Sequence, residues 1–551
     1  TGARIELFGL PLVPLPGLSH PAEQVAASGF LVPQVRLDRI NGLEFALPFY
    51  LRLNDSQDAT LTPHVYTSAA PMLEGEFRTL TGTGAITARG YATVSRRVGI
   101  SGTPTNGSDA FRGAIDTQAG FQFGRRWSLS ASGRLVTDRT FLRRYDITRD
   151  DRLRSTFSLE RNGGSSYLQI AGWAVQTLRV NDSQKQQPIA LPAIDFRQRL
   201  SDPVLGGAVQ LQVNSLALTR FGGQDTQRLF AGADWKLRQV LPTGQLLQLT
   251  ALLRGDVFHT QSIQDTPVAS YRGVAGWQAR AIAAGSADLT WPLIGKFGDG
   301  TQILTPHVQL VATPPIRNVQ LPNEDSRAFE LDDSNIFSIN RFPGNDRFED
   351  GARVTYGVEW AFNRPGLAVT TQIAQSYRLG NRPSLFADGT GLTARTSDVV
   401  GRTTIAFRDL LRLTHRFRID KDSLAVRRNE VDATIGTRRT YAVLGYSRLN
   451  RDIASLGEDL RDHEEVRAGA RIQVARYWSV FGSAVVDLTG PRDDVLAGTD
   501  GYTPVRHRLG IAYDDDCLSF AVTWRRDYLD RGDAKAGNSF LLRLEFRNLG
   551  V

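Results

Sequence analysis

Residues 43–53 read Leu-Glu-Phe-Ala-Leu-Pro-Phe-Tyr-Leu-Arg-Leu, so that every second residue is a large apolar one. Successive side chains of an extended strand point to opposite faces, and this stretch therefore predicts a strand with one apolar face and one mixed, partly polar face. Residues 54–58, Asn-Asp-Ser-Gln-Asp, are typical of a turn. The alternation resumes over residues 59–66, which predicts an antiparallel hairpin.

The same pattern returns along the 551-residue chain, over residues 411–419, 466–474, 480–488 and 540–546. Soluble sandwiches and propellers also alternate, but no propeller-like repeat of fixed period is visible. Segments of about 10 residues are typical of strands that cross an outer membrane, with apolar side chains outward and polar ones toward a lumen. At roughly 20 residues for a strand and its connection, the chain provides about 25 strands. We therefore expect an all-β protein, a large transmembrane antiparallel β-barrel.

Several classes of protein are excluded by what the sequence lacks. No stretch approaches the roughly 18 uninterrupted apolar residues of a membrane helix. The single cysteine, Cys517, excludes a disulfide framework or a cysteine-based metal site within the chain. Neither a phosphate-binding P-loop nor a nucleophile elbow is present, and none of the seven histidines has the spacing of a zinc-binding helix. We expect no enzyme activity, no cofactor and no metal.

The basic charge is almost entirely arginine. The chain has 65 Lys and Arg residues against 57 Asp and Glu, and all but five of the 65 are arginine. Guanidinium groups bind phosphate and carboxylate bidentately. These arginines occupy alternating strand positions and form no basic helix, which argues against a nucleic-acid partner. Lumen-facing arginines either bind acidic sugars and phosphates or, as we favour, pair with acidic groups of the lumen and of a plug; they include Arg412, Arg416, Arg418, Arg467 and Arg471.

One long irregular region covers residues 314–350, and it contains a cluster of acidic side chains. A structureless segment of this length is usually functional or mobile, and we expect a large loop or a segment folded into the lumen. Its acidic residues lack the ligand pattern and fixed glycine of a calcium loop. We interpret them as solvated surface.

Three prolines, Pro33, Pro48 and Pro63, follow one another at intervals of 15 residues on the first three expected strands. Proline cannot donate a hydrogen bond to a neighbouring strand and is confined to edges and bulges. The spacing predicts either weak pairing at the barrel's edge or bends at its rim. We favour weak pairing, between a first strand at about residues 30–37 and a last strand at about residues 540–546.

Short stretches along nearly the whole chain resemble the LptD family of lipopolysaccharide-assembly proteins, in the same order. The stretches are IELFGLPLVPLP (5–16), SHP (19–21), SGFLVP (28–33), LPFY (47–50), DATLTP (58–63), LEGEFR (73–78), DRTFL (138–142), LPAIDF (191–196), NDRFEDGAR (345–353), YG (356–357) and FRNLG (546–550). Each piece is weak alone, but their number and order make the resemblance specific.

The resemblance implies a barrel of about 26 strands in the outer membrane of a Gram-negative bacterium. It implies a translocon that inserts lipopolysaccharide into the outer leaflet, among outer-membrane lipids, through a lateral gate between its first and last strands. An LptE-like lipoprotein would plug the lumen, and a periplasmic bridge protein would deliver lipopolysaccharide through a jellyroll domain. Residues 1–25 would be the end of that periplasmic domain and a linker, and residues 26–551 the barrel.

The resemblance also implies roles for single residues. Pro33 and Pro48 match prolines with which the family weakens pairing at its gate. We assign to the gate Pro33, Pro48, Pro63, Phe540, Leu542 and Leu544. Cys517 resembles the family's cysteine region near the barrel's end, and it either forms a disulfide to the missing domain or serves as a small packing residue. Two other functions stay open: a passive porin or substrate-specific channel, and a hydrolase built on a barrel.

Overall fold

The alternation seen in the sequence is realised as antiparallel β-structure along nearly all of the chain. In the computed structural model the described residues are 3–7, 10–15, 28–99, 104–179, 182–266, 268, 271–327, 329–450, 462–490, 501–516, 518–528, 530 and 532–546. The elements are, in chain order, β1 (Ala3–Leu7), β2 (Leu10–Leu15), β3 (Gly29–Phe30), β4 (Gln34–Asp38), β5 (Gly42–Ala46), β6 (Phe49–Asn54), β7 (Gln57–Tyr66), β8 (Met72–Thr81), β9 (Gly84–Val98), β10 (Pro104–Phe123), β11 (Trp127–Val136), α1 (Phe141–Arg144), β12 (Arg152–Asn162), β13 (Ser166–Thr177), the short 3-10 helix η1 (Gln184–Gln186), β14 (Ile189–Arg199), β15 (Ala208–Thr219), β16 (Asp225–Val240), β17 (Leu246–Gln261), the short 3-10 helix η2 (Ile263–Asp265), β18 (Gly276–Thr290), β19 (Leu293–Phe297), β20 (Gly300–Thr313), β21 (Gly351–Arg364), β22 (Leu367–Arg378), β23 (Val399–Phe407), β24 (Leu411–Ile419), β25 (Val426–Gly436), β26 (Tyr441–Leu449), β27 (His463–Gln473), β28 (Trp478–Asp487), β29 (Thr503–Asp514), β30 (Leu518–Asp527) and β31 (Gly537–Phe546).

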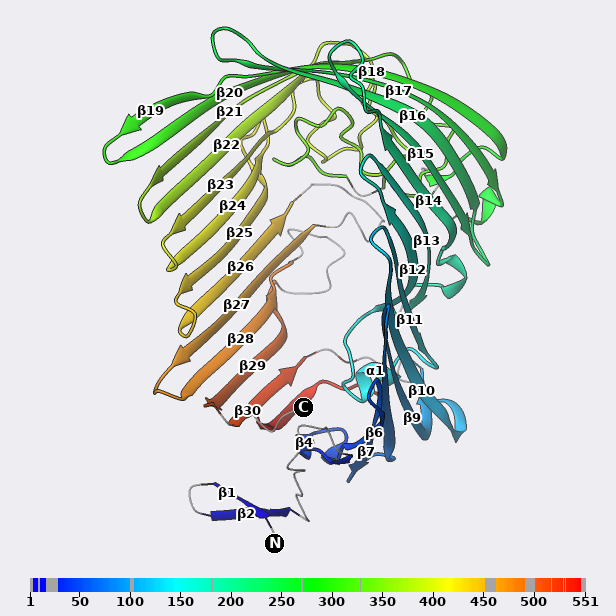
Figure 1. The fold of residues 1–551 in the computed structure, drawn as a ribbon, viewed down its shortest axis with the longest axis vertical. Helices are drawn as coiled ribbons and strands as arrows, with labels where there is room; N and C mark the ends of the chain where they lie inside the picture. Colours follow the sequence, from blue (N-terminus) through cyan, green and yellow to red (C-terminus); the bar gives the residue numbers. More distant parts are fainter. Residues whose placement is uncertain are drawn as a thin grey trace.

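Strands β3 to β31 form one closed antiparallel barrel of 26 strands (Figure 1). Three of these strands are interrupted, so that β3 and β4, β5 and β6, and β18 and β19 are each the two halves of one strand. The predicted fold class and the strand number are confirmed. Among the described residues, β1 and β2 pair with each other and with no other strand, in a separate two-stranded sheet.

In the barrel, apolar side chains are exposed on the outer surface and polar side chains are buried inside, the reverse of a soluble protein. On β5, Leu43 and Phe45 are each 45% exposed, whereas Glu44 between them is 7% exposed. On β7, Leu61 and Val65 are exposed and the polar residues between them are buried. An apolar outer surface around a polar interior is what a bilayer requires of a barrel. No helix among the described residues is long and apolar enough to span a membrane.

The two ends of the barrel have different connections. Adjacent antiparallel strands are joined at alternate ends, so each end collects every second connection. The connections of residues 137–151, 314–350 and 379–398 all lie at one end, which we call the loop end. Two-residue turns such as 298–299 and 365–366 lie at the other end, together with the start of β3 and the end of β31. Short turns at one end and long loops at the other are typical of outer-membrane barrels.

Residues 314–350 form the connection between β20 and β21 and have no regular secondary structure. This segment, light green in Figure 1, lies between the wall that contains β16 to β18 and the wall that contains β21 to β25. Its side chains include the fully buried Leu331 and Ile336, which pack against the barrel residue Val400 in one apolar cluster. The segment therefore fills part of the barrel interior, and of the two arrangements we expected it adopts the lumen-folded one. We refer to it below as the lumen segment.

Candidate functional site

The barrel closes where its first strand, β4, meets its last, β31, a junction that we call the seam. Residues 35–38 of β4 pair with residues 539–542 of β31, which makes four residue pairs, whereas β30 and β31 pair over ten. Phe540 lies opposite Leu37. Leu544 lies beyond the last pair of the seam in the described residues. In the described residues the seam is therefore much shorter than the junction of β30 with β31, and one pair shorter than the junction of β4 with β5, which has five pairs.

The three prolines lie side by side on the first three strands of the barrel. Pro33 separates β3 from β4, and Pro48 separates β5 from β6. The backbone N–H of Leu31 donates to the carbonyl of Pro48 at 2.8 Å, and that of Leu47 donates to the carbonyl of Pro63 at 3.4 Å. Because proline has no N–H, this row lacks three donors at one level of the wall. Strand β7 nevertheless continues through Pro63 without a break.

On the lumen side, a chain of charged groups leads toward the seam. Glu44 Oε1 lies 2.8 Å from Nδ1 of His64, and Glu74 Oε2 lies 3.1 Å from Nε2 of the same ring. Each carboxylate accepts one hydrogen bond from the ring when both ring nitrogens carry hydrogen. Arg36 of β4 continues the chain, with its Nη1 at 3.7 Å from Glu44 Oε2.

The connection of residues 137–151, which we call the latch segment, contacts both sides of the seam. The carboxylate of Asp146 lies 3.2 Å from Arg36 of β4 and 2.6 Å from Arg525 of β30. Arg149 forms a two-pronged ion pair with Asp527, also on β30. This segment thus links the first strand to the last strand pair, through Asp527, which follows Arg149 by 378 residues in sequence.

The latch segment is itself held firmly. Phe141 and Leu142 of α1 belong to a buried apolar cluster inside the barrel. Arg112 of β10, with 1% of its side chain exposed, pairs with Asp138 at 2.9 Å and with Asp533 at 2.7 Å. Burial alone would raise the pKa of Asp138, but hydrogen bonds from Arg112 outweigh it and keep that pKa below its usual range.

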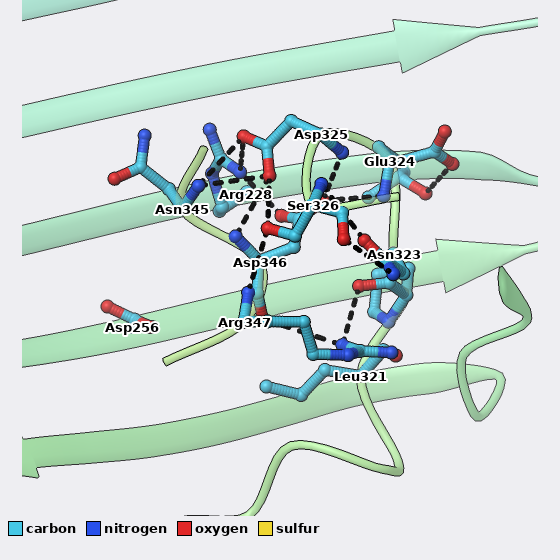
Figure 2. A network of polar contacts seen from close by, with 12 residues as sticks. Arg228, Asp256, Leu321, Asn323, Glu324, Asp325, Ser326, Asn345, Asp346 and Arg347 are labelled. Carbon is cyan, nitrogen blue, oxygen red and sulfur yellow. Dashed lines mark hydrogen bonds and ion pairs between the residues drawn. The ribbon is translucent and has the colours of Figure 1, made fainter. Parts of the chain in front are cut away.

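The lumen segment forms a second cluster of charged groups (Figure 2). Arg228 of β16 contacts Asp325 at 2.8 Å and Asp346 at 2.5 Å. Oδ2 of Asp346 accepts the backbone N–H groups of Glu324 and Asp325 at 2.6 and 3.0 Å. Glu324 in turn pairs with Arg220 at 2.6 Å.

Our interpretation of these acidic residues as solvated surface is wrong. Asp346 is 1% exposed, and the side chains of Glu324 and Asp333 are 3% exposed. A buried carboxylate needs a charged partner, and the arginines of the barrel wall supply it. Of the lumen arginines singled out in the sequence, Arg416 and Arg418 pair with this segment.

The other three lumen arginines singled out in the sequence, Arg412, Arg467 and Arg471, differ in whether they have an acidic partner. Arg467 lies 3.4 Å from Glu465, and Arg471 lies 2.7 Å from Asp514. Arg412 is exposed. Cys517 lies outside the described residues. Of its described neighbours, Asp515 donates its N–H to the carbonyl of Leu518. These two residues lie at the short-turn end, where the chain also enters the barrel.

A family model described as LptD, LPS transport system D, matches residues 110–478. The chain belongs to the LptD family. The LPS-assembly protein LptD of a Polaromonas species is 25% identical over 432 residues, which cover 72% of this chain and 50% of that protein. The proteins of the same name from Psychrobacter cryohalolentis and Acinetobacter baumannii are each 23% identical and cover 98% and 97% of this chain, and 55% and 64% of their own lengths. This chain thus spans about half to two thirds of the length of these relatives.

The solved structures that resemble the barrel are distant. The siderophore receptor PirA from Pseudomonas aeruginosa aligns with a TM-score of 0.35 and 10% identity, over 90% of this chain and 80% of that one. The ferric preacinetobactin receptor BauA from Acinetobacter baumannii aligns with a TM-score of 0.31 and 8% identity, over 94% and 80%.

Membership of the LptD family confirms the resemblance read from the sequence. An LptD-family barrel with an apolar outer surface is a protein of the Gram-negative outer membrane. The family is one of transport and assembly proteins, not of known enzymes.

Sequence reasoning placed the prolines and the two strands of the seam but missed the latch segment of this LptD-family barrel. Its key groups, Asp146 and Arg149, lie in a connection between strands, and their partners Arg525 and Asp527 come near the end of the chain. A usable signal was present: residues 138–154 carry ten charged side chains of both signs in a connection and its following strand. Such a density favours ion pairing with other elements.

The attachment of the lumen segment depends on pH, and we expect it to weaken in acid. Burial alone would raise the pKa of Glu324 and of Glu349, but Arg220 and Arg353 respectively outweigh it and lower both values. A carboxyl group with a lowered folded pKa stabilises the native state above its unfolded pKa, 4.5 for Glu, and this contribution is lost as the pH falls through the folded value.

Hydrogen exchange of residues 314–350, corrected for the intrinsic rate, tests this expectation. Protection at pH 7 and at pH 5.5 is expected to exceed protection at about pH 3.5. Strand β21, which follows directly, serves as the internal control and is expected to stay protected. Equal protection of the segment at all three pH values would contradict the proposed ionic attachment.

Proposed function

We propose that this chain moves lipopolysaccharide to the outer leaflet through a lateral opening between β4 and β31. The short seam supports the proposal most directly, because four residue pairs join these strands where ten join the next pair. A backbone hydrogen bond contributes about 0.5–1.5 kcal/mol net, so that a junction with fewer of them opens at lower cost.

The gate comprises Pro33, Pro48 and Pro63 on one side and Phe540, Leu542 and Leu544 on the other. The prolines remove donors from the first strands, so these strands can separate from their neighbours without breaking a full ladder. On the outer surface, Leu37, Phe540 and Leu542 are exposed. Acyl chains thus stay in the bilayer beside these residues, while the polar headgroup leaves the polar lumen through the gap.

The partners follow from the family. We infer an LptE-like lipoprotein in the part of the lumen that the lumen segment leaves, and a periplasmic bridge protein that acts through a jellyroll domain preceding the barrel. We further infer that Cys517 forms a disulfide with that domain, because β29 ends before it and β30 begins after it at the end where the chain enters the barrel. No phosphate-binding loop for a nucleotide is present in the sequence, so the energy for transport comes from upstream.

A passive porin or substrate-specific channel is the second candidate, and the size of the closed barrel is the observation that favours it. Planar-bilayer conductance separates the two. We expect the native protein with its lumen partner to show no large steady conductance, and cells with this protein as their sole copy to display lipopolysaccharide at the surface. A large steady conductance together with unchanged surface lipopolysaccharide on depletion would establish the pore and reject the translocon.

A further inference from the structure

A pocket at the loop end of the seam is lined by both edges of the barrel and by the latch segment. Seven basic side chains and three acidic ones line it. Arg36 comes from β4, Arg525 from β30, Arg149 from the latch segment and Lys535 from the connection between β30 and β31. An excess of cations at one place on the lumen side is a site for an anion.

Asp146 occupies the centre of this group of cations. Oδ2 of its carboxylate is shared between Arg36 and Arg525, which lie on opposite sides of the seam, and Oδ1 contacts Arg149 of the latch segment at 3.4 Å. The backbone of Asp146 has a φ of +54°, in the left-handed region that aspartate and asparagine tolerate better than most residues. The carboxylate is thus held at the one point where it bridges the two edges.

We propose that this pocket binds the phosphate groups of a phosphorylated glycolipid, and that a bound phosphate replaces the Asp146 carboxylate between Arg36 and Arg525. A phosphate monoester carries more negative charge than a carboxylate and has three acceptor oxygens, so it satisfies both guanidinium groups and leaves neither unpaired. The assignment of a lipid as the carrier of the phosphate rests on the proposed function.

The exchange couples the lipid to the seam. While Asp146 holds Arg36 and Arg525, the latch segment ties β4 to β30 on the lumen side. A phosphate on the two arginines releases Asp146, and the link that its carboxylate makes between β4 and β30 is lost, while the contacts of Arg144 with Asn41 and of Arg149 with Asp527 remain. The seam would therefore open more easily when a phosphorylated headgroup has reached it than in its absence.

Two substitutions with opposite expected effects test the pocket. Asp146→Asn keeps the size and the backbone preference of the residue but removes the competing charge, and we expect affinity for the phosphorylated glycolipid to rise roughly tenfold. Arg36→Gln and Arg525→Gln remove a cation, and we expect affinity to fall roughly tenfold. Asp195→Asn is the matched control, because Asp195 also pairs with an arginine, Arg197 at 2.6 Å, but on β14; it is expected to change nothing.

Binding is measured on the purified native protein in detergent, with three probes. These are a bisphosphorylated glucosamine-disaccharide lipid, the same lipid after enzymatic removal of its phosphates, and inorganic phosphate. Heat-modifiable mobility, the difference in gel migration between heated and unheated samples, checks that each variant is a folded barrel. The proposal expects opposite changes for the Asp146 and arginine variants with the first probe, and loss of these changes with the second.

Three results would overturn the proposal. The first is lower or unchanged affinity for the phosphorylated lipid in Asp146→Asn, and the second is equal affinity for the lipid with and without phosphates. The third is that the opposite affinity changes of the Asp146 and arginine variants occur with inorganic phosphate but not with the lipid. Each concerns binding, which needs no transport. Phosphate-independent binding with normal delivery therefore rejects the pocket alone. Phosphate-dependent binding with undiminished delivery through a locked seam rejects the lateral exit alone.

Discussion

A disulfide between positions 37 and 540 is expected to reduce delivery of lipopolysaccharide to background and to release it again on reduction. Leu37 and Phe540 lie directly opposite each other across the seam. The Cα atoms of directly opposed antiparallel residues are about 4.5–5.5 Å apart, which is within the range of a disulfide. The double variant Leu37→Cys with Phe540→Cys therefore locks the strands that the proposed exit must separate. Surface lipopolysaccharide in cells that depend on the variant, with and without reductant, is the measurement.

The control is a disulfide placed between two strands that, under the proposal, stay paired during transport. Leu229 of β16 and Val257 of β17 are also directly opposed and exposed, in a ladder of sixteen residue pairs. We expect the disulfide variant Leu229→Cys with Val257→Cys to deliver lipopolysaccharide normally. Undiminished delivery with the seam cross-linked would reject a lateral exit, and equal loss in both variants would show that rigidity of the barrel, rather than the seam, is being measured.

The architecture of the barrel was predictable because it follows from local sequence patterns, namely the alternation of apolar and polar residues and the positions of prolines. The alternation of residues 43–53 depends only on the two faces of one strand, and it reappears as exposed Leu43 and Phe45 around buried Glu44. The interruptions at Pro33 and Pro48 follow from a missing N–H, which is a property of the residue itself. Pro63 shows the limit of this reasoning, because β7 passes through it unbroken although the two barrel strands before it are divided.

The charged clusters were not predictable in the same way, because their partners are distant in sequence. Asp346 was interpreted as solvated, and its partner Arg228 lies 118 residues earlier on the barrel wall. The sequence shows that both charges exist, but only the closed barrel brings the lumen segment against β16. Asp146 is the same case, since Arg36 and Arg525 belong to opposite ends of the chain. Local patterns therefore predict the wall of the barrel, and tertiary pairing decides what is attached to it.

Replacing Arg228 by methionine is expected to detach the lumen segment while leaving the wall intact. Arg228 is 5% exposed and is the ion-pair partner of both Asp325 and Asp346, so Arg228→Met leaves the buried carboxylate of Asp346 and the partly exposed one of Asp325 without it. Removing one partner of a buried ion pair costs about 3–5 kcal/mol. Strand β16 keeps its ladder with β17, which does not depend on this side chain. Trypsin is the measurement, because Arg327, Arg341 and Arg347 lie inside the segment and are expected to become cleavable.

A second substitution distinguishes lost charge pairing from lost packing. Asp346→Asn removes one of the two uncompensated charges and keeps an oxygen that accepts the N–H groups of Glu324 and Asp325, so the double variant with Arg228→Met is expected to resist trypsin better than Arg228→Met alone. Arg364→Met is the matched control: its pair with Asp299, at 3.6 Å, is exposed, and exposed pairs contribute about 0–1 kcal/mol. A segment that stays uncleaved in Arg228→Met, or a double variant cleaved faster than the single one, would mean that apolar packing around Leu331 and Ile336 alone holds the lumen segment in place.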